Sequence, residues 1–181
     1  SRLNQKKREV SLIIVEEKQL IGNKNFDRIS EIHVFDEAEG MGEITLGKAL
    51  SKGQSENKND QGFGKMGRYG FGLYMSSISQ CRKTVIHTWQ KNVILKSWLD
   101  IDEIVDSDED IEYVPVENLK ELPDELKKIL PKKINESGTI VSWKNLDFTK
   151  WKTAEGLFNN VENEICLLYT SPSPRDKRQS R

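Results

Sequence analysis

The chain has 181 residues, which suits a single domain, and 35% of them are hydrophobic, enough for a modest core. Positive and negative side chains nearly cancel to a net charge of −1, which argues against a general nucleic-acid-binding surface. No run approaches the ~18 apolar residues of a membrane-spanning helix. The two cysteines offer neither a disulfide framework nor metal-ligand spacing, so we expect a reducing, cytoplasmic location.

The N-terminal part predicts two strands in an antiparallel pair. Residues 9–17 form a short apolar run rich in β-branched side chains, and residues 29–35 form a second. Between them, Gly22-Asn23 predicts a hairpin turn. The second strand leads into Asp36, whose ordinary role would be to shape a turn or to cap the helix expected over residues 43–51. The alternative is a carboxylate that accepts a hydrogen bond from a ligand amine.

A glycine-rich segment at residues 62–72 follows a polar stretch that we expect to be a loop or lid. Helical spacing over residues 71–81 predicts that this segment opens a helix, where unpaired N–H groups and the helix dipole suit a phosphate. A dinucleotide site is disfavoured, because no apolar strand precedes Gly62 and His87 stands where an acid is expected. The P-loop pattern is absent, and a flexible loop without a ligand stays an alternative.

The remaining elements are predicted from local patterns. We expect strands at residues 83–90 and 93–101, a helix at 119–130, a strand entered at 135–143 and a final helix at 153–164. The seven acids of residues 100–110 are interpreted as a solvated strand end or loop rather than a cation site. We expect Trp89 and Trp98 to pack within the sheet rather than to form a binding surface. His33 and His87 are single histidines on strands, and we assign neither a catalytic role.

Three features stand in order along the chain: Asp36 with a later Gly40-Met41, a lid leading to the glycine loop, and Gly138-Thr139 entering a late strand. Together they resemble the Bergerat-fold ATP-binding domain of the GHKL superfamily (gyrase, heat-shock chaperone, histidine kinase, MutL), over residues 9–145. Residues 49–79 look most like MORC-type and bacterial chaperone-like members. The resemblance implies an α/β, two-layer sandwich with a mixed, mostly antiparallel sheet and helices on one face.

The resemblance also implies a site for ATP and Mg²⁺. Asp36 would accept from the adenine amino group, Gly40 would let the base approach the main chain, and Met41 would lie against it. Guanine would present an oxygen to the carboxylate instead, which disfavours it. Thr139 would hydrogen-bond near Asp36 and a bound water. The phosphates would be cradled by Gly67, Gly70 and Gly72, with Gly62, Gly64 and Lys65 in the lid.

Two departures from the family pattern bear on activity. Glu37 and Ala38 stand where the family usually has Asn and Gly. The family's first helix carries a Glu that activates water and an Asn that helps hold Mg²⁺, and residues 1–8 contain no suitable Glu-x-x-x-Asn. We therefore expect a fragment without its first helix, leave ATP hydrolysis by the fragment open, and assign no catalytic or metal-ligating residue.

The favoured function is an ATP-binding domain of an ATPase whose nucleotide state moves the lid and drives dimerisation or docking of later domains. The alternatives are a non-catalytic interaction module with a degenerate site and, less favoured, the ATP-binding domain of a sensor kinase. The expected partners are an adenine nucleotide and a second copy of the full-length protein; no membrane is expected, and the fragment does not indicate nucleic acid. Residues 166–181 resemble a translated sequencing adapter, so we expect the native domain within residues 1–165.

Overall fold

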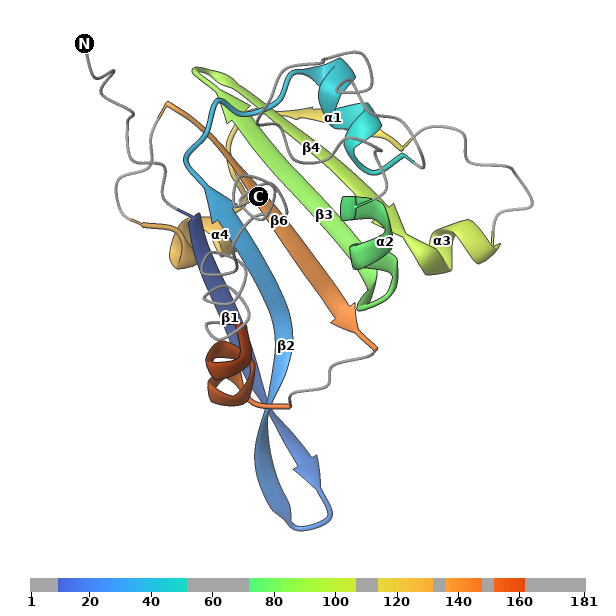
Figure 1. Cartoon of the computed structure of the whole chain (residues 1–181), viewed down its shortest axis with the longest axis vertical. Helices are drawn as coiled ribbons and strands as arrows, with labels where there is room; N and C mark the ends of the chain where they lie inside the picture. Colours follow the sequence, from blue (N-terminus) through green and yellow to red (C-terminus); the bar gives the residue numbers. More distant parts are fainter. Residues whose placement is uncertain (1–9, 52–71, 107–113, 132–135, 148–151, 162–181) are drawn as a thin grey trace, which may run out of the picture.

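The computed structural model describes residues 10–51, 72–106, 114–131, 136–147 and 152–161, which form one sheet with helices packed against it (Figure 1). The strand order is β1-β2-β6-β3-β4-β5, and every neighbouring pair is antiparallel. The strands are β1 (Val10–Ile21), β2 (Lys24–Asp36), β3 (Cys81–Gln90), β4 (Val93–Asp100), β5 (Val116–Leu119) and β6 (Ser137–Leu146). The helices are α1 (Glu43–Ala49), α2 (Gly72–Ile78), α3 (Ile101–Asp106) and α4 (Asp124–Ile129), with a further helix over residues 154–161.

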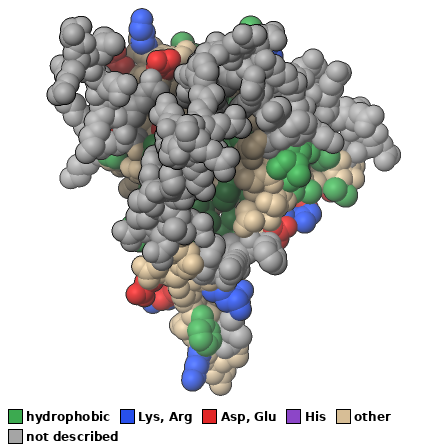
Figure 2. Space-filling model, viewed as in Figure 1, with side chains coloured by type: hydrophobic (Ala, Val, Ile, Leu, Met, Phe, Trp, Pro, Cys, Tyr) green, Lys and Arg blue, Asp and Glu red, His purple; other side chains and the backbone are tan. Residues whose placement is uncertain are grey.

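The β1–β2 hairpin confirms the predicted antiparallel pair. Its two-residue loop is Gly22-Asn23, and Gly22 has a φ of 63°, which glycine adopts without steric cost. Both strands are longer than predicted, and β6 pairs with β2 only along residues 32–36, so the hairpin end projects from the sheet. Figure 2 shows hydrophobic and basic side chains on this end, where Leu20 and Phe26 are exposed.

One face of the sheet carries α1, α2, α3 and the helix over residues 154–161. Leu46 and Leu50 of α1 join Ile86 of β3 and Leu95 of β4 in one buried cluster. Leu157 packs separately against strand residues from β2. Because successive strand residues point to opposite faces, these contacts leave the other face to a different set of side chains.

The opposite face is covered in part by α4, which Figure 1 draws behind the sheet. Leu126 of α4 packs with Phe35, Trp89 and Ile140, and the rings of Phe35 and Trp89 stack with centroids 5.9 Å apart. Burial of Trp89 confirms its interpretation as sheet packing. The predicted α/β layers around a mostly antiparallel sheet are confirmed, and α4 adds a short helix on the second face.

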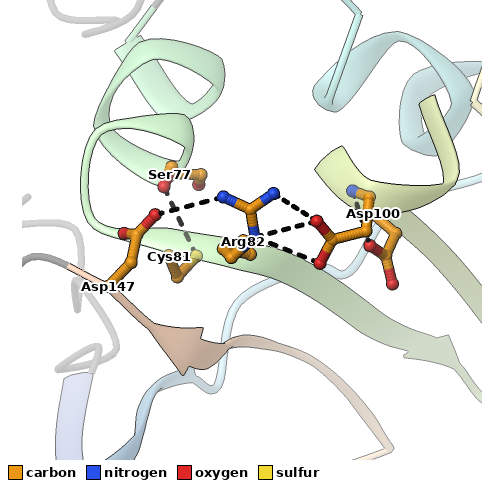
Figure 3. Close-up of polar contacts among 6 residues, drawn as sticks. Ser77, Cys81, Arg82, Asp100 and Asp147 are labelled. Atoms are coloured by element: carbon orange, nitrogen blue, oxygen red, sulfur yellow. Dashed lines mark hydrogen bonds and ion pairs between the residues drawn. The ribbon is translucent and has the colours of Figure 1, made fainter. Parts of the chain in front are cut away.

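The acidic segment after β4 was expected to be a strand end or loop, and this was wrong for its first part. Residues 101–106 form α3, and the Asp100 carboxylate accepts the N–H of Asp102 at 3.1 Å. Asp102 also lies in the first turn of α3, where its negative charge interacts favourably with the positive end of the helix dipole and stabilises the helix. Arg82 of β3 bonds to the Asp102 carboxylate and pairs with Asp147, so it joins both to the sheet. Figure 3 shows the Arg82 guanidinium directed toward Asp147.

Two other predicted boundaries were wrong. The helix expected over residues 119–130 begins only at Asp124, after Pro123, and residues 116–119 instead form β5 alongside β4. Cys81, expected at the end of the helix over residues 71–81, is the first residue of β3. Its thiol still contacts α2, because the sulfur donates to the Ser77 carbonyl at 3.3 Å (Figure 3). In both places sheet pairing overrides a local helical pattern.

Candidate functional site

Three strands place Asp36, Thr139 and Thr88 side by side. Asp36 of β2 is opposite Thr139 of β6, and Thr139 is opposite Thr88 of β3. Directly opposed residues in antiparallel pairs share a face, so the three side chains form one row across the sheet. Thr88 and Thr139 are buried, whereas Asp36 is partly exposed. The row therefore ends in a carboxylate that a ligand can reach.

The segment that follows β2 is held closely against the end of β3. Gly40 has a φ of 70°, and a Cβ at this position would lie 2.4 Å from the carbonyl oxygen of Trp89. The next residue, Met41, donates its N–H to the hydroxyl of Thr88 at 2.8 Å. Both the backbone angle and the close approach require glycine at position 40.

Asp36 is oriented by its own turn. Its Oδ1 accepts the N–H of Ala38 at 2.9 Å, and the Ala38 carbonyl accepts the Ser137 hydroxyl at 2.8 Å. Among the described residues the only non-glycine positions with positive φ are Lys91 and Asn145, so Ala38 needs no glycine-like backbone. A carboxylate has about four acceptor positions, so the turn leaves capacity for a ligand amine.

Gly138-Thr139 enters β6 at a crowded point. A Cβ on Gly138 would lie 2.7 Å from the ring of Trp89 and 2.9 Å from the carbonyl oxygen of Asp36. The hydroxyl of Thr139 lies 3.1 Å from that of Thr88, which also donates to the Gly138 carbonyl at 3.1 Å. Thr139 was identified from the sequence, whereas Thr88 was missed, because a lone threonine in a strand carries no local signal of a site.

A cavity of about 610 Å³ lies beside this row and not over it. Met41 lines the cavity and also contacts Thr88, so it forms the boundary between the cavity and the row. Asp36 and Thr139, which the sequence predicts to contact the base, do not line this cavity. We place the candidate site on the row because these two residues lie opposite each other there. The cavity lining consists of Glu39, Met41, Gly42, Glu43, Gln90, Lys91, Val93, Leu95, Asn118, Glu136 and Ser137.

The predicted phosphate loop is described only at its end. Gly72 opens α2, while Gly62, Gly64, Lys65, Gly67 and Gly70 lie outside the described residues. Leu73 and Tyr74 of α2 pack against the same buried cluster as Met41. This shared core holds the end of the loop and the Gly40-Met41 segment in one layer on one face of the sheet.

The two histidines lie on the opposite face. His33 is buried, with Nδ1 2.8 Å from the Ser142 hydroxyl and Nε2 3.2 Å from a Glu31 oxygen. This Glu-His-Ser order is typical of nucleophilic catalysis, but Ser142 has 0% exposure, so no substrate reaches its hydroxyl. Burial, aided by lysine charges, lowers the pKa of His87 to about 4. Both side chains are buried within the packing of this face.

The described ranges contain no group of three or more His, Cys, Asp and Glu side chains arranged to hold a metal ion. Within the same ranges no helix combines the length and apolar character needed to cross a bilayer.

Residues 11–135 match the family described as histidine kinase-, DNA gyrase B- and HSP90-like ATPase. A comparison with curated proteins found no match. Among solved structures the chain is similar to the ATPase and transducer domains of DNA topoisomerase II from Balamuthia mandrillaris, at 15% identity and a TM-score of 0.46. The alignment covers 74% of this chain and 34% of that one, so the chain spans about a third of that protein's length. Since the family match extends over more than half of the chain, this protein belongs to the histidine kinase-, DNA gyrase B- and HSP90-like ATPase family.

Proposed function

We propose that this chain is the ATP-binding domain of an ATPase, and that it binds an adenine nucleotide through Asp36, Gly40, Met41 and Thr139. The observation that carries the proposal is the alignment of Asp36 with Thr139 on neighbouring strands, next to the tightly held Gly40-Met41 segment. These residues are far apart in sequence, and the sheet brings them together.

The row suits adenine chemically. Asp36 is a partly exposed acceptor already oriented by the Ala38 N–H, and adenine presents an exocyclic amine as a donor. Gly40 brings bare main chain to the site, because a side chain there would meet the Trp89 carbonyl. Met41 supplies an apolar, polarizable side chain suited to the flat face of a base.

The glycine loop would hold the phosphates, as the resemblance implies for Gly62, Gly64, Lys65, Gly67, Gly70 and Gly72. Mg²⁺ usually binds through substrate phosphates with one or two carboxylates, and it would enter with the nucleotide. We further propose that nucleotide binding closes the lid formed by residues 51–61 and the loop, and that this closure drives dimerisation of the full-length protein. Within the family, residues 49–79 favour a MORC-type or chaperone-like ATPase over a sensor kinase.

The proposal is tested by isothermal titration of ADP into the wild-type chain and into Asp36→Asn. The amide presents an N–H₂ group to the adenine amine and loses a charged acceptor, so affinity should fall about 10- to 100-fold. The matched control is Asp27→Asn, the same change on an exposed residue of the projecting hairpin, which should leave affinity unchanged.

Two results would contradict this proposal. Unchanged ADP affinity in Asp36→Asn would remove Asp36 from the site. A wild-type chain that binds neither ADP nor ATP would favour the alternative, an interaction module that keeps the fold and has lost the nucleotide site. The replacement of the usual Asn and Gly by Glu37 and Ala38 is the feature that supports this alternative.

A further inference from the structure

We propose that Thr88 is a specificity-determining residue of the nucleotide site, because it orients the hydroxyl proton of Thr139 away from the bound base. The inference rests on the proposed function, since it concerns how the row distinguishes one base from another. Thr88 itself is fully buried at 0% exposure and acts through its neighbours, so it is a positioning residue.

The three hydrogen bonds around Thr88 can all be made at once in only one arrangement of the hydroxyl protons. A hydroxyl has one donor and two acceptor positions. The Met41 N–H can only donate to Thr88 Oγ1, at 2.8 Å, and the Gly138 carbonyl can only accept from it, at 3.1 Å. These two contacts use the single proton and one lone pair of Thr88. The third contact, to Thr139 Oγ1 at 3.1 Å, is then satisfied only if Thr139 donates.

This direction leaves Thr139 with acceptor positions alone. Its neighbour across the β2–β6 pair is Asp36, whose carboxylate is also an acceptor. A ligand that meets this row therefore faces two adjacent acceptors, which an exocyclic amine satisfies. A base with a carbonyl oxygen at the same position would place a third acceptor against the oxygens of Asp36 and Thr139. None of the three could then form a hydrogen bond with another, and buried acceptors left without a donor weaken binding. Thr88 thus extends the preference for adenine beyond the carboxylate of Asp36.

The same hydroxyl also anchors the main chain that would contact the base. The Met41 N–H is bound to Thr88, and the preceding Glu39 carbonyl accepts from the Gln90 side chain at 3.0 Å. Loss of the Thr88 hydroxyl would therefore release both the Met41 amide and the Thr139 proton. A free Thr139 hydroxyl can rotate and donate to a carbonyl, which is how guanine would become acceptable.

The experiment compares the dissociation constants of Mg²⁺-ADP and Mg²⁺-GDP by isothermal titration. In Thr88→Val, which removes the hydroxyl at similar volume, we expect the ratio of GDP to ADP dissociation constants to fall about tenfold. In Thr88→Ser, which keeps the hydroxyl, the ratio should stay within about twofold of wild type. The ratio is informative because a general loss of packing would weaken the binding of ADP and of GDP to the same extent and leave the ratio unchanged.

The matched control is Thr84→Val. Thr84 lies on the same face of β3, is equally buried and bonds to the Cys81 thiol at 3.3 Å. Its replacement should lower the melting temperature and leave the nucleotide ratio unchanged. Should Thr88→Val fail to fold, Thr88→Cys replaces it, because a thiol is a much weaker hydrogen-bond donor and acceptor than a hydroxyl.

The outcomes separate this inference from the proposed function. A wild-type chain that prefers ADP, with the same ratio in Thr88→Val or Thr88→Cys, overturns the role of Thr88 and leaves the nucleotide site standing. An equal fall of the ratio in Thr84→Val also overturns it, since the effect would then be one of general packing. A wild-type chain that binds neither nucleotide overturns the proposed function, and this inference with it.

Discussion

Replacement of Gly40 by alanine tests the contact that brings the site's main chain against β3. Gly40 has a φ of 70°, and an L-residue held in the left-handed region costs about 1–2 kcal/mol. The new Cβ would also lie 2.4 Å from the Trp89 carbonyl oxygen and 3.0 Å from Cγ of Gln90. The carbonyl belongs to the sheet backbone and cannot rotate away, so residues 39–41 must shift, at a further ~1–3 kcal/mol.

The matched control is Gly22→Ala in the β1–β2 turn. Gly22 has nearly the same angle, a φ of 63°, but apart from its own residue and its two chain neighbours no atom lies within 4 Å of the place that the alanine methyl group would take. We therefore expect Gly22→Ala to lower the free energy of unfolding by the strain alone, about 1 kcal/mol, and Gly40→Ala to lower it by about 3 kcal/mol. The difference between the two variants measures the close approach itself.

The assay is urea unfolding followed by tryptophan fluorescence, combined with ADP titration. Trp89 is a suitable reporter because it is 4% exposed and stacked on Phe35. Gly40→Ala should also weaken ADP binding, while Gly22→Ala should not. Equal losses of stability in the two variants would refute the close contact at Gly40, and unaltered ADP binding in Gly40→Ala would refute its place in the site.

Two further predictions concern the opposite face of the sheet. His87 is buried, and its pKa of about 4 lies below the 6.5 of an exposed histidine, so the unfolded chain binds more protons as the pH falls. Between about pH 7.5 and about pH 5 the wild type should lose about 2 kcal/mol more unfolding free energy than His87→Leu, and parallel losses would contradict this. Leu126→Ala in α4 should cost about 2–5 kcal/mol, because it opens a cavity against Phe35 and Trp89. The control Leu20→Ala, at a 67% exposed site, should cost under ~0.5 kcal/mol, and a similar cost for both would contradict the packing of α4.

Elements defined by contacts near in sequence were predictable. The turn at Gly22-Asn23 and the strands expected at residues 83–90 and 93–101 appear close to their predicted bounds, because turn residues and flanking apolar patterns are local signals. The end of β2 at Asp36 and the start of α1 at Glu43 were also found from local patterns. These signals depend on backbone preferences that each short segment carries by itself.

Elements that depend on distant partners were not predictable. β5 is four residues long, too short for a periodic signal, and it exists because β4 offers an edge to pair with. The acids after β4 were interpreted as a loop, since only the tertiary structure shows Asp100 capping α3 and Arg82 reaching Asp102. The position of α4 on the second face likewise follows from packing on Phe35 and Trp89.

The candidate site divides in the same way. Asp36, Gly40, Met41 and Thr139 could be identified from the sequence, because turn chemistry and the family resemblance mark them. Their proximity, and the part taken by Thr88, follow from the insertion of β6 between β2 and β3. That strand order rests on long-range hydrogen bonds between segments far apart in the chain, such as Thr88 to Thr139 and Ser137 to Ala38. The sequence by itself thus identified which side chains carry the chemistry of the candidate site. Only the strand order of the sheet determined which of these side chains lie next to one another.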